Sequence, residues 1–136
     1  MTDVNSHLVP GALEGVRVLD VAEPLGAFVS RLFGDLGADV IKVEPPGGDP
    51  ARNLLPFATA GDDRLSLPFV RANMNKRSVV LDLEQRQDQE RLRALIDLSD
   101  IVVSTEGLST WLARGIDVER LSSSHPKLVW LSFSLF

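Results

Sequence analysis

The chain has 136 residues, a length typical of one domain, and 44% of them are hydrophobic while 24% are charged. It contains no cysteine, which excludes disulfides, zinc thiolates and thiol nucleophiles. The net charge of −5 argues against nucleic acid and anionic membranes as partners, because phosphate binding needs a basic surface. The first residues lack the basic and apolar regions of a signal peptide, and no apolar run is long enough to span a bilayer. We therefore expect a soluble cytoplasmic protein without a metal site.

Several runs of the chain are short, apolar and rich in β-branched residues, as buried strands are. In chain order they are Val16–Val21, Ala38–Glu44, Arg77–Leu83, Asp100–Thr105 and Lys127–Phe133. Their near-continuous apolar character is typical of strands that are covered on both faces.

Between these runs lie segments whose apolar residues have the spacing of one helix face. Leu25–Leu36 carries Leu25, Phe28, Val29, Leu32, Phe33 and Leu36 on one predicted inward face. Gln85–Leu98 forms a second predicted helix with Leu92, Leu95 and Ile96 inward, and shorter helices are predicted at Ser109–Arg114 and Val118–Ser124. The stretch Pro45–Met74 is rich in proline and glycine and shows no sustained period, so we expect it to be mostly irregular.

Alternation of strands and helices predicts right-handed βαβ units. The fold class is therefore α/β: a Rossmann-like open parallel sheet with flanking helices, ending after about the fifth strand. In such sheets ligands bind beyond the carboxyl ends of the strands, which here means Ala22–Gly26, Glu44–Asp49, Leu81–Gln85 and Ser104–Ser109.

Glu44 ends the second predicted strand and is followed directly by two prolines. An acid at this place holds a ribose in dinucleotide-binding folds, but the glycine-rich fingerprint of those folds is missing, because Gly26 stands alone after the first strand. The alternative is a local role, in which Glu44 pairs with a nearby cation such as Lys42 or Arg52.

The segment "NMNKRS" (73–78) places Lys76 and Arg77 just before the third strand. Both cations could meet a phosphate, although a solvated entry to a strand explains the same composition. The segment "GGDP" (47–50) similarly predicts either a backbone nest for an anion or a plain turn.

Taken in order, the blocks "LEGVRVLDV", "FGDLGADVIKVEPPGGDPAR", "NKRSVVLDL", "SDIVV", "RGIDVERL" and "HPKLVWLSFS" resemble the N-terminal part of the class III coenzyme A transferases, the CaiB/BaiF family. This family includes formyl-CoA and carnitine CoA transferases and α-methylacyl-CoA racemases. The resemblance runs from about Leu13 onward. It implies acyl-CoA and carboxylate substrates, with CoA moved between them.

For the site, the resemblance implies that Asn75, Lys76, Arg77, Leu81 and Arg52 contact CoA. The family's catalytic aspartate, which attacks the thioester, lies beyond the strand at which this chain ends. We therefore expect residues 1–136 to be one domain of a longer protein, with no catalytic residue of their own and no acyl transfer alone. Full-length members form interlocked homodimers, whereas for this chain we expect a monomer or a weak dimer.

Two loops differ from the family pattern: "EPLGAF" (23–28) replaces a turn of small residues, and "STEGLS" (104–109) replaces an E-N-F-R-P-G-like loop. A cation usually found further along would fall at Ala113, with Arg114 adjacent. Because both loops follow strands at the expected ligand edge, a second hypothesis is a non-catalytic module that serves dimerisation or scaffolding. A third is a nucleotide-binding module that uses Glu44 on a ribose.

Overall fold

The computed structural model describes residues 11–60 and 63–133. The main sheet consists of β1 (Arg17–Val21), β2 (Asp39–Glu44), β5 (Arg77–Val80), β6 (Ile101–Ser104) and β7 (Val129–Ser132). A small hairpin consists of β3 (Phe57–Ala60) and β4 (Asp63–Ser66). The helices are α1 (Pro24–Asp35), η1 (Pro50–Asn53, a 3₁₀ turn), α2 (Leu67–Asn73), α3 (Arg86–Asp97), α4 (Leu108–Ala113) and α5 (Val118–Ser124). The first ten residues, judged above not to be a signal peptide, lie outside the described residues.

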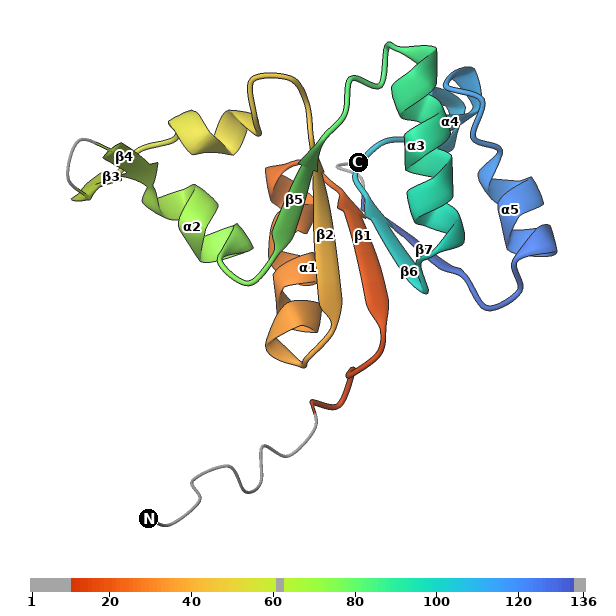
Figure 1. The fold of residues 1–136 in the computed structure, drawn as a ribbon, viewed down its shortest axis with the longest axis horizontal. Helices are drawn as coiled ribbons and strands as arrows, with labels where there is room; N and C mark the ends of the chain where they lie inside the picture. The colour runs from red at the N-terminus through yellow and green to blue at the C-terminus, as the bar shows by residue number, and fades with distance from the viewer. Residues whose placement is uncertain (1–10, 61–62, 134–136) are drawn as a thin grey trace.

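All strands of the main sheet are parallel and follow the order β5-β2-β1-β6-β7 (Figure 1). This confirms the predicted α/β fold with a Rossmann-like parallel sheet. The order reverses direction between β1 and β6, where the loops that follow these two strands diverge toward opposite sides of the sheet. The sheet therefore offers a ligand crevice at the carboxyl ends of its central strands.

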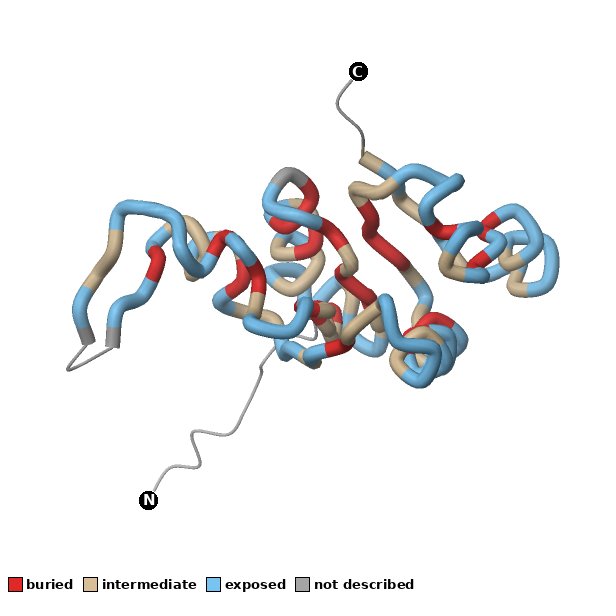
Figure 2. The backbone as a smooth tube through the Cα atoms, turned by 90° about the horizontal axis from the view of Figure 1, so that it is seen from above, coloured by how far each residue is buried: buried red, intermediate tan, exposed pale blue. Residues whose placement is uncertain are grey.

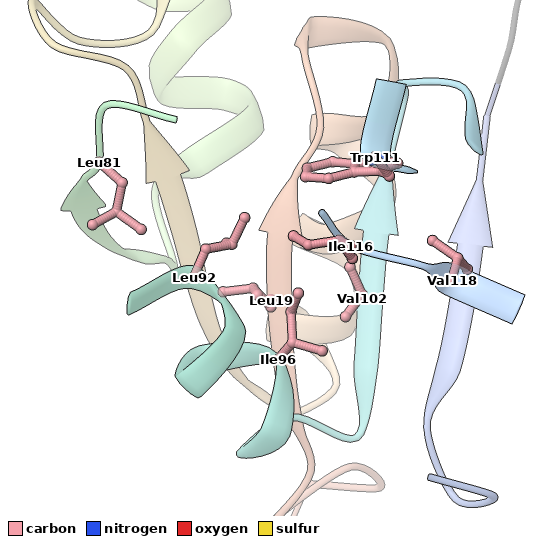
Figure 3. Close-up of a cluster of buried hydrophobic side chains, with 8 residues drawn as sticks. All are labelled: Leu19, Leu81, Leu92, Ile96, Val102, Trp111, Ile116 and Val118. Carbon is pink, nitrogen blue, oxygen red and sulfur yellow. The ribbon is translucent and has the colours of Figure 1, made fainter. Parts of the chain in front are cut away.

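Helices cover both faces of the sheet, as near-continuous apolar strands require. Alternate β1 residues serve the two faces: Val18 packs on the α1 side, and Leu19 packs under α3, α4 and α5. The cluster on the Leu19 side also contains Trp111 of α4 and is drawn in Figure 3. Buried residues concentrate in the middle of the molecule, while the β3–β4 hairpin at one end is largely exposed (Figure 2). Among the described helices, none is long and apolar enough to cross a membrane.

The expectation of a mostly irregular segment between residues 45 and 74 is wrong. This segment contains η1, the β3–β4 hairpin and α2, which packs against α1. Prolines begin helices here rather than interrupt them, since Pro50 and Pro68 occupy the first turns of η1 and α2. Asp49 and Ser66 cap the same two elements by accepting hydrogen bonds from backbone N–H groups. Elements of four to seven residues are too short to show a hydrophobic period.

The inward face predicted for α1 is also only partly right. Phe28 and Leu32, placed inward by their spacing, are 41% and 45% exposed, whereas Gly26, Ala27 and Ser30 are buried. Small residues face the sheet because the helix begins very close to it. A Cβ on Gly26 would lie 2.7 Å from the Ala22 Cβ and 3.1 Å from the Thr105 Cγ2.

Gly26→Ala should therefore destabilise the fold by about 2 kcal/mol, because the added methyl group overpacks a rigid contact and outweighs the gain in helix propensity. Urea denaturation followed by circular dichroism measures the change. Gly107→Ala is the matched control and should cost less than about 1 kcal/mol, since its new methyl group would meet nothing nearer than the Ser109 Oγ at 3.9 Å. Equal losses in the two variants would refute the close approach of α1.

Candidate functional site

A cavity of about 250 Å³ opens at the carboxyl ends of β1, β2 and β5, the edge at which the fold class predicts a ligand. Its lining residues come from the last residues of β1 and β2, from the segments that follow β1, β2 and β5, from the loop after β6 and from the end of α4. They are Val21, Ala22, Glu23, Lys42, Val43, Pro45, Pro46, Asp49, Pro50, Leu81, Asp82, Leu83, Glu84, Glu106 and Arg114. The lining therefore combines apolar side chains with nearly as many charged ones.

A buried ion-pair network borders this cavity through the lining residues Lys42 and Asp49. Asp20 on β1 and Lys42 on β2 are partners in the parallel register, and the Lys42 Nζ lies 4.0 Å from the Asp20 Oδ2. The same Nζ lies 2.8 Å from the Asp49 Oδ2 and donates to the Ala22 carbonyl at 3.1 Å. None of the three charged side chains is more than 5% exposed. Lys42 therefore holds the loop after β2 against the end of β1.

Lys76 completes the network from the turn before β5. Its Nζ donates to the Asp20 Oδ2 and the Ala27 carbonyl, both at 2.7 Å, and to the Asn73 Oδ1 at 2.8 Å. Its side chain is 1% exposed. Burial lowers the pKa of Lys76, while the adjacent Asp20 carboxylate opposes this change. The three hydrogen bonds of the ammonium group are thus made within the protein.

Glu44 anchors the loop that follows β2. Its Oε2 accepts hydrogen bonds from the Asp49 N–H at 2.9 Å and the Arg52 Nε at 2.7 Å, and its Oε1 accepts from the Arg52 Nη2 at 2.7 Å. The Arg52 guanidinium also lies 3.9 Å from the centre of the Phe69 ring. These bonds lower the pKa of Glu44 from 4.5 to about 2, with the Arg52 hydrogen bond as the largest cause. The local role predicted for Glu44 is confirmed, with Arg52 rather than Lys42 as its partner.

The five residues predicted to contact CoA lie in different parts of the structure. Leu81 follows β5 and lines the cavity, and Arg52 is held by Glu44 next to the lining residue Asp49. Lys76 is buried under α1, and Asn75 donates to the Arg31 carbonyl and to Asp35.

Arg77 lies at the other edge of the sheet, because it begins β5 and forms a bidentate pair with Asp39 at the start of β2. The structure therefore places Leu81 in the cavity lining, Arg52 beside the lining residue Asp49, and Asn75, Lys76 and Arg77 away from it. Contact of these three residues with CoA stays a prediction.

Sequence reasoning did not single out Asp20, and it considered Asp49 and Glu106 only as parts of the segments "GGDP" and "STEGLS". The first of these had a visible signal, since Asp20 and Lys42 are charged residues inside apolar strands, and a buried strand tolerates such a residue only with a partner. The Glu106–Arg114 ion pair had no such signal, because it links the loop after β6 to the end of α4. Within residues 11–60 and 63–133, no group of three or more acidic or histidine side chains could hold a metal ion.

These features define an α/β domain with a Rossmann-like sheet and a ligand cavity at its switch-point edge. Comparison with known families identifies it further: the family model for CoA-transferase family III matches residues 13–136. The chain belongs to this family.

Curated relatives have CoA-transferase functions. Succinyl-CoA:mesaconate CoA-transferase of Haloarcula hispanica is 37% identical over 93% of this chain and 32% of its own length. Succinate–glutarate CoA-transferase of Agrobacterium fabrum is 37% identical over 100% of this chain and 35% of its own length. Formyl-CoA:oxalate CoA-transferase of Streptomyces coelicolor is 36% identical over 92% of this chain and 30% of its own length. The chain thus spans about a third of the length of the curated relatives it matches.

Solved structures agree with this assignment. A CaiB/BaiF family protein from Brucella suis superimposes with a TM-score of 0.82 at 33% identity, over 91% of this chain and 33% of the other. Rv3272 from Mycobacterium tuberculosis gives a TM-score of 0.78 at 33% identity, over 93% and 35%.

Removal of the central charge of the network should destabilise the protein strongly. Asp20→Asn leaves two buried lysines with one carboxylate fewer, and the loss of one partner from a buried ion pair costs about 3–5 kcal/mol. Asp39→Asn is the matched control, because Asp39 pairs with Arg17 and Arg77 but is 37% exposed. The control should lose about 1 kcal/mol or less. Urea unfolding of both variants tests this, and similar losses would count against a structural role of the network.

Lowering the pH should reduce the free energy of unfolding, because Glu44 becomes protonated. The folded-state pKa of about 2 lies below the unfolded value of 4.5, so the unfolded state binds the proton first as the pH falls. The stabilisation is complete above about pH 5 and is lost as the pH falls toward 2. Its size is about 2 kcal/mol, after allowance for solvent around the Arg52 side chain, which is 45% exposed.

Glu44→Gln should reduce the loss of unfolding free energy at acid pH. A series of urea denaturation curves between pH 2 and 7 measures this dependence. Glu90→Gln is the control, since Glu90 pairs with Arg86 on the exposed face of α3. An unchanged pH dependence in Glu44→Gln would show that other groups control it.

Proposed function

We propose that this chain forms the CoA-binding part of a family III CoA transferase, which moves CoA between an acyl-CoA and a carboxylate, or of a related acyl-CoA racemase. One observation carries the proposal: this chain, which belongs to the family, has a cavity where the carboxyl ends of three parallel strands meet. The names of the relatives, which use succinyl-CoA, glutarate or formyl-CoA and oxalate, support CoA thioesters as the ligand class.

The cavity walls suit the less polar parts of such a ligand. Val43, Pro46, Leu81 and Leu83 supply apolar surface on the β2 and β5 sides. Pockets for small molecules combine such walls with a few polar groups that fix orientation. In this proposal Leu81 contacts CoA directly, whereas Arg52, outside the lining, contacts it only by giving up its two hydrogen bonds to Glu44.

Asn75, Lys76 and Arg77 are not assigned CoA contacts in this proposal. The polar groups of Lys76 and Asn75 bond to oxygens of the chain itself, and Arg77 pairs with Asp39 at the amino edge of the sheet. A ligand contact by any of them would first have to break these bonds, which costs a desolvation penalty for each group released.

A non-catalytic role is the second candidate, and the charge of the cavity favours it. Within the part of the chain that the structure describes, its lining carries two cations, Lys42 and Arg114, against five carboxylates: Glu23, Asp49, Asp82, Glu84 and Glu106. Both cations already form ion pairs, with Asp49 and Glu106 respectively. CoA carries several phosphate charges, so such a lining weakens its binding.

Titration calorimetry of the 136-residue chain with CoA, acetyl-CoA and NAD separates the candidates. Binding of CoA and acetyl-CoA without NAD supports the transferase proposal, and absence of binding to all three supports the non-catalytic module. Binding of NAD alone would overturn both candidates and support the nucleotide-binding hypothesis.

A charge reversal at the cavity tests where CoA binds. Glu84→Arg should tighten CoA about fivefold to tenfold, because it replaces a repulsive carboxylate with a cation that can contact phosphate. Glu90→Arg makes the same charge change on α3, outside the cavity lining, and should alter the affinity by less than about twofold at physiological salt. Calorimetry at one fixed salt concentration measures both, and equal effects would place CoA elsewhere.

A further inference from the structure

Among the described residues that line the cavity, Arg114 is the one cation that reaches solvent. Its side chain is 21% exposed, whereas the Lys42 side chain is 2% exposed and bonded to Asp49. A ligand phosphate entering the cavity can therefore approach the Arg114 guanidinium far more easily than the Lys42 ammonium. The guanidinium, however, holds the Glu106 carboxylate as its ion-pair partner.

Neighbouring groups fix both members of this ion pair. The Glu106 N–H donates to the Ser104 Oγ at 3.1 Å, and the Trp111 Nε1 donates to the same Oγ at 2.8 Å. The Arg114 guanidinium lies 5.4 Å from the centre of the Trp111 ring. Trp111 is 1% exposed, so the loop after β6 and the end of α4 are both held against one rigid side chain. Arg114 is thus presented to the cavity in a defined position.

We propose that Glu106 determines whether the cavity accepts an anionic ligand: its carboxylate occupies the Arg114 guanidinium, and a ligand phosphate must replace it. A guanidinium binds carboxylate and phosphate with the same planar set of donors, so the two anions compete for one site. The Glu106 side chain is 29% exposed and can regain water when it is displaced. The exchange is therefore reversible, and the internal carboxylate lowers the affinity for phosphate. This inference rests on the proposed CoA site.

The test measures binding of inorganic pyrophosphate and of CoA to the 136-residue chain by calorimetry. Glu106→Gln removes the competing charge and should tighten both ligands about tenfold, the effect of one charge-assisted hydrogen bond made available. In an Arg114→Gln background the same substitution should give no gain. Glu90→Gln is the matched control, since Glu90 also pairs with an arginine, Arg86, but lies outside the cavity lining. It should change either affinity by about twofold or less.

Several outcomes overturn the inference. They are a gain in Glu106→Gln no larger than in Glu90→Gln, an equal gain in the Arg114→Gln background, or no pyrophosphate binding to Glu106→Gln. Glu106→Asp, which shortens the side chain, is a second variant in case the first unfolds, and it should give a smaller gain in the same direction. A pyrophosphate gain with no CoA binding by any variant would support the role of Glu106 and refute the CoA proposal. CoA binding that is indifferent to Glu106→Gln would do the reverse.

Discussion

Asp20 lies fully buried between two lysine ammonium groups, and the geometry of the ligand edge depends on this arrangement. Removing a carboxylate from water costs several kcal/mol, so such a group persists only when its oxygens are satisfied. Here the Asp20 oxygens accept from the Ala22 N–H, the Ser30 hydroxyl and Lys76, so that β1, α1 and the turn before β5 meet at one side chain. Lys42 extends the same network to Asp49 and thereby holds the loop after β2.

The loop after β2 is held at its other end by a second charged group. Glu44 bonds the Asp49 N–H and the Arg52 guanidinium, which explains an acid placed directly before two prolines. Gly47 and Gly48, both with φ of +88°, allow the turn between these anchors. The loop is therefore anchored on both sides, so that the chain's own bonds hold the cavity wall that it forms. Anchoring of this kind reduces the conformational entropy that is lost on binding.

This cavity differs from a simple anion-binding site in its charge, because its cations are already paired with carboxylates of the chain. Each of its cations is matched by a carboxylate of the chain, one buried and one partly exposed. The buried Lys42–Asp49 pair maintains the structure, whereas the Arg114–Glu106 pair lies within reach of solvent and can exchange partners. Family membership and the position of the cavity favour a CoA ligand, and the acidic lining sets the electrostatic conditions under which that ligand would bind.

Local patterns in the sequence determined much of the fold: the five strand runs, the helices between them and the parallel arrangement all follow from hydrophobic period and chain order. The prediction failed between residues 45 and 74, where elements of four to seven residues leave no period to detect. Only the tertiary structure decided which side chains meet. Lys76 joins Asp20 across 56 positions, and Arg114 joins Glu106 through the end of a short helix. The physical reason is that ion pairing depends on strand register and on how each helix packs against the sheet. Neither can be predicted from the hydrophobic period of a single segment.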